Sequence, residues 1–101
     1  MSGWDSLFDY ASKKPLHKYS AMFGGSRGLV TVFDEGIVIQ ASGRNTVVRA
    51  NYVHELSKLS DEPFSKVKAE LAYYDMFGNL EHSQFVLNAN DFLALKQDLR
   101  K

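Results

Sequence analysis

The sequence predicts a mainly β domain of the α+β class, in which about six or seven antiparallel strands form a strongly bent sheet and a short helix stands at each end of the chain. Three observations predict this fold. In the middle of the chain, apolar residues alternate with polar ones or form β-branched runs, separated by short glycine-containing segments. Both ends of the chain carry apolar residues at helical spacing. The length of 101 residues suits one domain with one core.

The N-terminal segment is predicted to form a short amphipathic helix. Trp4, Leu7, Phe8 and Ala11 recur at positions i, i+3, i+4 and i+7, which places them on one helix face. Pro15 disfavours helical geometry in the residue before it, so it marks the end of this helix. We expect the apolar face to pack against the sheet.

The long middle segment is predicted to form the antiparallel strands. Residues 29–33 and 37–41 are rich in β-branched residues, and the segment between them suits a tight hairpin with Gly36 in the left-handed conformation. Residues 67–73 alternate apolar and polar with a period of two. Further strands are expected at residues 19–23, 46–49 and 81–87, with turns at residues 24–28, 42–45, 60–63 and 76–79.

Residues 51–59 allow two interpretations. Apolar residues recur at helical spacing from Tyr52 to Leu59, whereas the alternation from Val53 to Ser57 fits a strand. We expect a short turn that leads into a strand containing residues 54–56.

The C-terminal segment is predicted to form an amphipathic helix. Phe92, Leu95 and Leu99 share one face, and either Asn88 or Asn90 caps the N-terminal end. One apolar helix face has the right shape to plug the open end of a small, strongly bent sheet.

The hairpin GLVTVFDEGIVI (residues 28–39), the strand–turn–strand pattern TVVRANYVHEL (residues 46–56) and the closing helix (residues 90–101) together resemble a pleckstrin-homology-like (PH-like) domain. Such domains occur in small bacterial and archaeal proteins of unknown function. The resemblance implies a barrel of two packed antiparallel sheets with one end capped by the helix. On this basis a single PH-like domain covers residues 1–101, with an N-terminal helical extension (1–16), antiparallel strands (18–88) and a capping helix (89–101).

The resemblance implies a binding module, because members of the family bind phosphoinositides, phosphopeptides or proteins. Lipid-binding members place several Lys and Arg on the first strand, the following loop and the second strand. Here those places hold Lys18 and Arg27 and little else. The usual Trp of the closing helix is replaced by Phe92. The resemblance therefore points to an interaction module rather than to specific phosphoinositide recognition.

Composition excludes several classes of function. Twelve Lys and Arg balance twelve Asp and Glu, so the basic surplus typical of nucleic-acid binders is missing, and we expect no nucleic-acid partner. The chain contains no cysteine, which favours a reducing compartment, the cytoplasm, and excludes thiolate zinc sites.

No motif in the sequence predicts catalysis or metal binding. His17, His54 and His82 have neither helical i, i+4 spacing nor a nearby carboxylate motif, so we expect no metal. The serine in the glycine-rich segment 24–28 lacks the strand-to-helix context of a nucleophile elbow. We therefore expect no enzyme and no cofactor.

Two groups of residues are candidates for contacts with partners. Tyr73, Tyr74, Met76 and Phe77 cluster before a turn and predict a contact surface for a protein partner or for self-association, which a strand edge could also mediate. The alternative is a peripheral binder of anionic lipid, in which Lys13, Lys14, Lys18 and Arg27 meet a membrane surface weakly.

Overall fold

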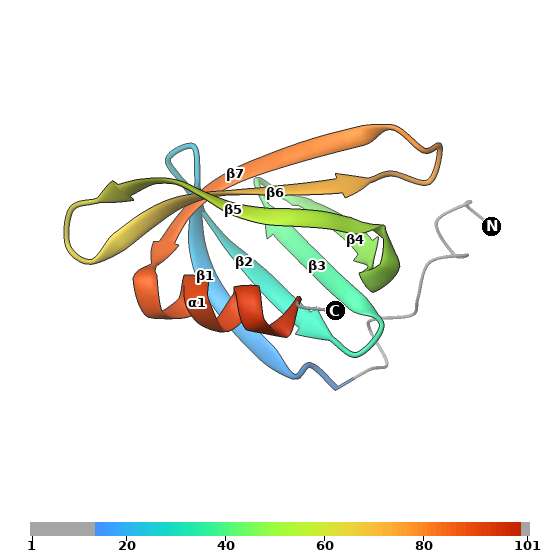
Figure 1. The fold of residues 1–101 in the computed structure, drawn as a ribbon, viewed down its shortest axis with the longest axis horizontal. Coiled ribbons are helices and arrows are strands. Elements are labelled where there is room, and N and C mark those ends of the chain that lie inside the picture. The colour runs from blue at the N-terminus through green and yellow to red at the C-terminus, as the bar shows by residue number, and fades with distance from the viewer. Residues whose placement is uncertain (1–13, 100–101) are drawn as a thin grey trace.

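The computed structural model describes residues 14–99, which form seven strands and one C-terminal α-helix (Figure 1). The order of these elements agrees with the predicted one, and residues 51–59 contain the expected short turn followed by a strand. The elements are β1 (His17–Phe23), β2 (Ser26–Phe33), β3 (Gly36–Ala41), β4 (Arg44–Arg49), the 3₁₀ turn η3 (Ala50–Tyr52), β5 (Val53–Glu62), β6 (Lys66–Tyr74), β7 (Leu80–Asn88) and α1 (Ala89–Asp98).

All strands belong to one antiparallel sheet with the order β4-β3-β2-β1-β7-β6-β5. The register joins β1 to β7 at one residue pair, Met22 with Val86, whereas the other neighbouring strands pair along most of their length. The sheet bends at this narrow junction. It therefore has a four-stranded half (β1–β4) and a three-stranded half (β5–β7), with α1 beside both (Figure 1).

The predicted closed barrel is wrong, although the bent antiparallel sheet and the closing helix are confirmed. β4 and β5 are the two edges of the sheet and do not pair with each other. A barrel requires hydrogen-bonded pairing around the whole ring. Here η3 carries the chain from one half to the other, so the ring stays open between β4 and β5.

The predicted N-terminal helix falls mainly on residues 1–13, which lie outside the described residues. Residues 14–16, the end of its expected range, are not helical. The backbone N–H of Leu16 donates to the carbonyl of Val32 at 2.8 Å, so the chain already lies along β2 there.

The glycine-rich turn is shorter than predicted. Gly24 and Gly25 form it with φ values of 60° and 93°, and β2 begins at Ser26. Gly28 therefore lies within β2 rather than in the turn, and its lack of a side chain matters for packing. A Cβ at Gly28 would lie 2.5 Å from the Phe23 ring and 2.6 Å from the Gln40 carbonyl, so glycine permits close approach within the sheet.

Three other turn predictions need correction. Arg44 and Asn45, expected in the turn at residues 42–45, belong to β4 and pair with Ala41 and Gln40, so only residues 42 and 43 form that turn. Residues 60–62 belong to β5, because Asp61 pairs with Val67 in the ladder, and the turn lies at residues 63–65 instead. Gly36 is the first residue of β3 and pairs with Phe33. It is not among the described glycines with positive φ, so the expected left-handed conformation is not found there.

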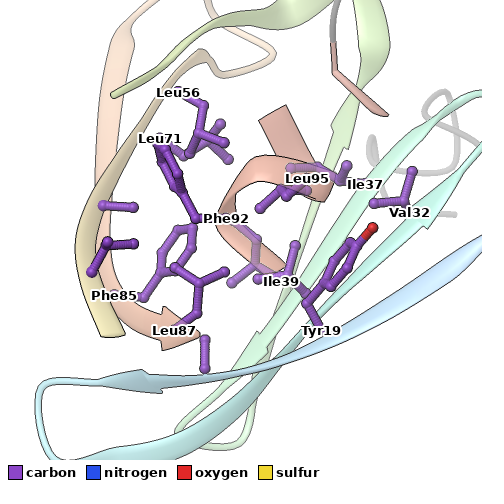
Figure 2. Packing of buried hydrophobic residues seen from close by; sticks show 14 of the residues in the cluster. Tyr19, Val32, Ile37, Ile39, Leu56, Leu71, Phe85, Leu87, Phe92 and Leu95 are labelled. Carbon is purple, nitrogen blue, oxygen red and sulfur yellow. The ribbon is translucent and has the colours of Figure 1, made fainter. Parts of the chain in front are cut away.

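The main core lies where the inner faces of the two halves meet on α1 (Figure 2). Phe92 and Leu95 are buried in it, and Leu99 packs against it, which confirms the predicted apolar ridge. Asn88 is the N-cap, since its side chain accepts a hydrogen bond from the backbone N–H of Asn90 at 2.8 Å. The strands contribute Tyr19, Ala21, Val30, Val32, Ile37, Ile39, Val48, Leu56, Val67, Ala69, Leu71, Phe85 and Leu87 to this core.

Hydrogen bonds fasten α1 to each half. On the four-stranded half, the Tyr19 hydroxyl donates to Asp98 at 2.6 Å, and His17 Nδ1 lies 3.0 Å from the same carboxylate oxygen. On the three-stranded half, Lys96 donates to the Leu56 carbonyl at 2.7 Å. The helix position relative to both halves is therefore specified by polar contacts as well as by packing.

Candidate functional site

The β6–β7 hairpin ends in a turn that is organised by one carboxylate. Asp75 Oδ1 accepts hydrogen bonds from the backbone N–H groups of Phe77 at 2.8 Å and Asn79 at 2.9 Å. The backbone N–H of Asp75 donates to the Asn79 carbonyl at 2.9 Å, and Gly78 has a φ of 83°. Hydrogen bonds from Asn79 and Phe77 hold the pKa of Asp75 below its usual value. This network gives the turn a defined shape.

The turn presents large apolar side chains to solvent. Phe77 is 81% exposed at the tip, and three neighbours are each about two-fifths exposed. Figure 1 shows this hairpin extending beyond the end of α1. We call this set the hairpin-tip surface; its members are Tyr74, Met76, Phe77 and Leu80.

Tyr73 does not belong to the hairpin-tip surface, although the sequence groups it with Tyr74. Adjacent strand residues face opposite ways, and Tyr73 is half-buried against the core. Tyr74 faces outward, where its ring meets the His54 ring edge-on at a centroid distance of 5.8 Å. Burial raises the pKa of Tyr73, and Glu81 raises it further, whereas Arg44 acts in the opposite direction.

A cleft of about 340 Å³ lies on the inner side of the same hairpin, between the two halves of the sheet. Its apolar part includes Phe23, whose ring packs against Phe85 at 5.1 Å. Arg44 comes from the four-stranded half and Glu81 from the three-stranded half, so the cleft carries both signs of charge. The lining residues are Phe23, Ile39, Ala41, Ser42, Arg44, Thr46, Tyr73, Glu81, His82 and Ser83.

The cleft is lined by hydroxyl, imidazole and carboxylate groups, which can form hydrogen bonds. Nucleophilic catalysis needs a hydroxyl held next to a base that a third group orients. His82 contacts Glu70, with 3.6 Å between Nδ1 and Oε1, and Gln84 donates to the same carboxylate at 3.0 Å. His82, Glu70 and Gln84 thus form a polar network at the surface, and no hydroxyl group takes part in these contacts.

The three histidines lie apart. His17 contacts Asp98, His54 contacts Tyr74 and His82 contacts Glu70. Across residues 14–99, no group of three potential metal ligands lies close enough to hold an ion.

The predicted basic contact residues do not form one cluster. Lys13 lies outside the described residues, and Lys14, Lys18 and Arg27 are exposed. Lys18 pairs with Thr31 and Arg27 pairs with Met22, so the two side chains are four residues apart along β2, roughly 13 Å. In the described part of the chain, no helix is long and apolar enough to cross a bilayer.

Sequence reasoning missed one exposed aromatic residue, Phe64. It lies in the turn between β5 and β6, is 91% exposed and has a φ of 63°, a conformation that non-glycine residues rarely adopt. Its place after Pro63 and outside both period-two patterns was the available signal. Phe64 and Phe77 thus mark opposite ends of β6.

Comparison with known proteins supports the fold alone. No protein-family model and no curated protein matches the chain. The chain is similar to a solved structure described as the C-terminal domain of an unknown protein from Leishmania infantum, with 12% sequence identity and a TM-score of 0.64. The match covers 97% of this chain and 94% of that one. The helix-closed, bent antiparallel sheet is therefore an arrangement that another protein shares.

Proposed function

We propose that this chain is a non-enzymatic protein-interaction module that binds a protein partner through the hairpin-tip surface. The observation that supports this most directly is the Phe77 side chain, which is 81% exposed on a turn held by Asp75. The turn is stabilised by the carboxylate of Asp75 and by the positive φ of Gly78. Phe77 contributes only its backbone N–H to these hydrogen bonds, so its side chain is not needed to form the turn. A large apolar side chain presented on a fixed turn is typical of an interface anchor.

The charges near the tip indicate the chemistry of the partner. Residues 74–81 contain two carboxylates, Asp75 and Glu81, and no Lys or Arg. An apolar pocket with a basic rim complements this surface, whereas an anionic bilayer would repel it. The residues of the anionic-lipid alternative, Lys18 and Arg27, lie on β1 and β2 and are spread apart. A protein partner is therefore the better-supported choice.

A PH-like architecture is part of the same proposal. Seven antiparallel strands in two halves with a C-terminal helix against both support it. The opening between β4 and β5 is the departure from the closed form that the resemblance implies. The lack of cysteine supports a reducing, cytoplasmic setting.

The experiment compares two exposed phenylalanines. Tagged wild-type chain, Phe77→Ser and Phe64→Ser are used for quantitative capture from native lysate, and each captured protein is then purified and titrated against the three chains. We expect one protein that binds the wild type and Phe64→Ser equally and binds Phe77→Ser roughly 30-fold more weakly, which is the loss of about 2 kcal/mol typical of an anchor.

Phe64→Ser is the matched control, because it also removes an exposed phenylalanine from a hairpin turn. Equal binding by all three chains contradicts the proposal. So does salt-sensitive sedimentation with anionic vesicles that is lost in Lys18→Gln and Arg27→Gln, since that result supports the lipid alternative.

A further inference from the structure

The outer face of the four-stranded half buries apolar side chains that do not belong to the main core. Thr31, Phe33 and Val38 alternate with core residues along β2 and β3, so they point away from α1. Phe33 and Val38 form a separate cluster, against which Val47 packs. Val38 is 1% exposed. A side chain in the middle of an uncovered sheet face remains accessible to water, so this burial indicates that chain covers the face.

A groove of about 190 Å³ marks the place. Its apolar lining comes from Leu29, Phe33 and Val38, and the charged Lys18 lines it as well. Pro15 also lines it. The chain that precedes Pro15 therefore starts at the groove itself.

We propose that residues 1–13 of this chain dock in this groove, with Trp4, Leu7 and Phe8 against Phe33 and Val38. This inference does not depend on the proposed function. The segment carries its apolar residues at one helical spacing, which matches a single apolar surface. It also carries Asp5 and Asp9, which complement the charge of Lys18.

The segment is long enough to reach every part of the groove. Lys18, Thr31, Val38 and Val47 form one row across the four strands. Val38 is two strands from β1, roughly 10 Å at the usual strand spacing. Thirteen residues span about 20 Å even as a helix. The outer face of the three-stranded half offers no such surface, since Lys66, Lys68 and Glu70 point outward there.

If residues 1–13 dock there, they cover the outer face of the four-stranded half and block other partners from it. A second apolar partner could then reach this face only by displacing the segment. The hairpin-tip surface lies on the other half and stays accessible in either case.

Trp4 makes the proposal directly measurable, because it is the sole tryptophan of the chain. In the full chain we expect blue-shifted Trp4 emission and strong protection from acrylamide. Leu29→Lys places a charge in the groove at a half-exposed position, which spares the main core. This variant should shift the Trp4 emission to the red and raise acrylamide quenching several-fold, while far-UV circular dichroism stays that of the folded chain.

The matched control is Val86→Lys, a half-exposed valine on the outer face of the three-stranded half, which should leave Trp4 emission unchanged. Three results would overturn the proposal. Trp4 of the folded wild type is quenched as fully as in urea; or Leu29→Lys and wild type give the same quenching; or protection appears only as the protein concentration rises, which assigns the groove to a second copy instead.

Discussion

The two halves of the sheet bury their strands differently. In the four-stranded half, the last four residues of β2 and the first four of β3 are all buried, so side chains on the outer face are buried as well as those on the inner face. In the three-stranded half, β6 alternates from Lys66 to Leu71, with Val67, Ala69 and Leu71 buried and Lys66 and Glu70 outside the core, and Ala72 is buried on the other face. A strand that is buried on both faces has a continuous run of apolar residues, whereas a strand that is buried on one face has an alternating pattern. The two halves therefore differ in how far the outer face of the sheet is buried.

Inner-face substitutions should cost the same in both halves. Ile37 and Leu71 are both 0% exposed, one in each half. We expect Ile37→Ala and Leu71→Ala each to lower the free energy of unfolding by about 2–5 kcal/mol, because each leaves a cavity in one shared core. Urea denaturation followed by circular dichroism and by Trp4 fluorescence measures this. Two separate transitions would contradict a shared core and indicate that the halves unfold independently.

Substitutions on the outer face of the sheet should have different effects on stability in the two halves. Val38→Ala removes two methyl groups from a fully buried site and should cost about 1.5–2.5 kcal/mol. Val86→Ala, on the outer face of β7, removes the same groups from a half-exposed site and should cost less than about 1 kcal/mol. Urea midpoints of the two variants give the comparison. Equal costs would mean that the outer face of the four-stranded half is no better covered than that of the other.

Local sequence patterns predicted the strands and the helix, but they did not predict contacts that form only when the chain has folded. Local periodicity correctly predicted the strand from Val67 to Tyr73 and the Phe92–Leu95 ridge, but the alternation of burial ends at Leu71 because Ala72 is also buried. Gly28 was misassigned to a turn, because the Phe23 ring and the Gln40 carbonyl of β3, which leave no room for a Cβ, come close to it only in the folded sheet.

The candidate site divides in the same way. The turn at residues 76–79 was predicted from Gly78 and its neighbours, and Phe77, which is exposed, was one of the four residues predicted to form a contact surface. The cleft was not predicted, because it brings together residues as distant as Phe23 and Ser83. Barrel closure was also predicted wrongly, because β4 and β5 lie at opposite edges of the sheet, and whether they meet is decided by the arrangement of all seven strands rather than by a local pattern.

The smallest expected effect concerns the pH dependence of stability, and it is tested with one tyrosine from each half of the sheet. Tyr19 is buried and donates to Asp98, whereas Tyr73 is half-buried at the cleft. Burial, followed by the hydrogen bond to Asp98, raises the pKa of Tyr19, and burial also raises that of Tyr73. A tyrosine with a raised pKa favours the folded state while the unfolded chain is also protonated, below pH roughly 10. Above that pH the unfolded state loses its protons first, so stability falls as pH rises.

Tyr19→Phe should therefore act in two ways. At neutral pH it should lower the free energy of unfolding by about 1 kcal/mol, because Asp98 loses a hydrogen bond but keeps its contact with His17. Above pH roughly 10 the variant should lose stability less steeply than the wild type, since the group with the raised pKa is gone. Tyr73→Phe should change that slope less, because the half-exposed phenol remains partly solvated. Urea midpoints between neutral pH and pH roughly 11 decide this; a Tyr19→Phe slope equal to that of the wild type would mean that the phenol–carboxylate contact does not hold α1 to the four-stranded half.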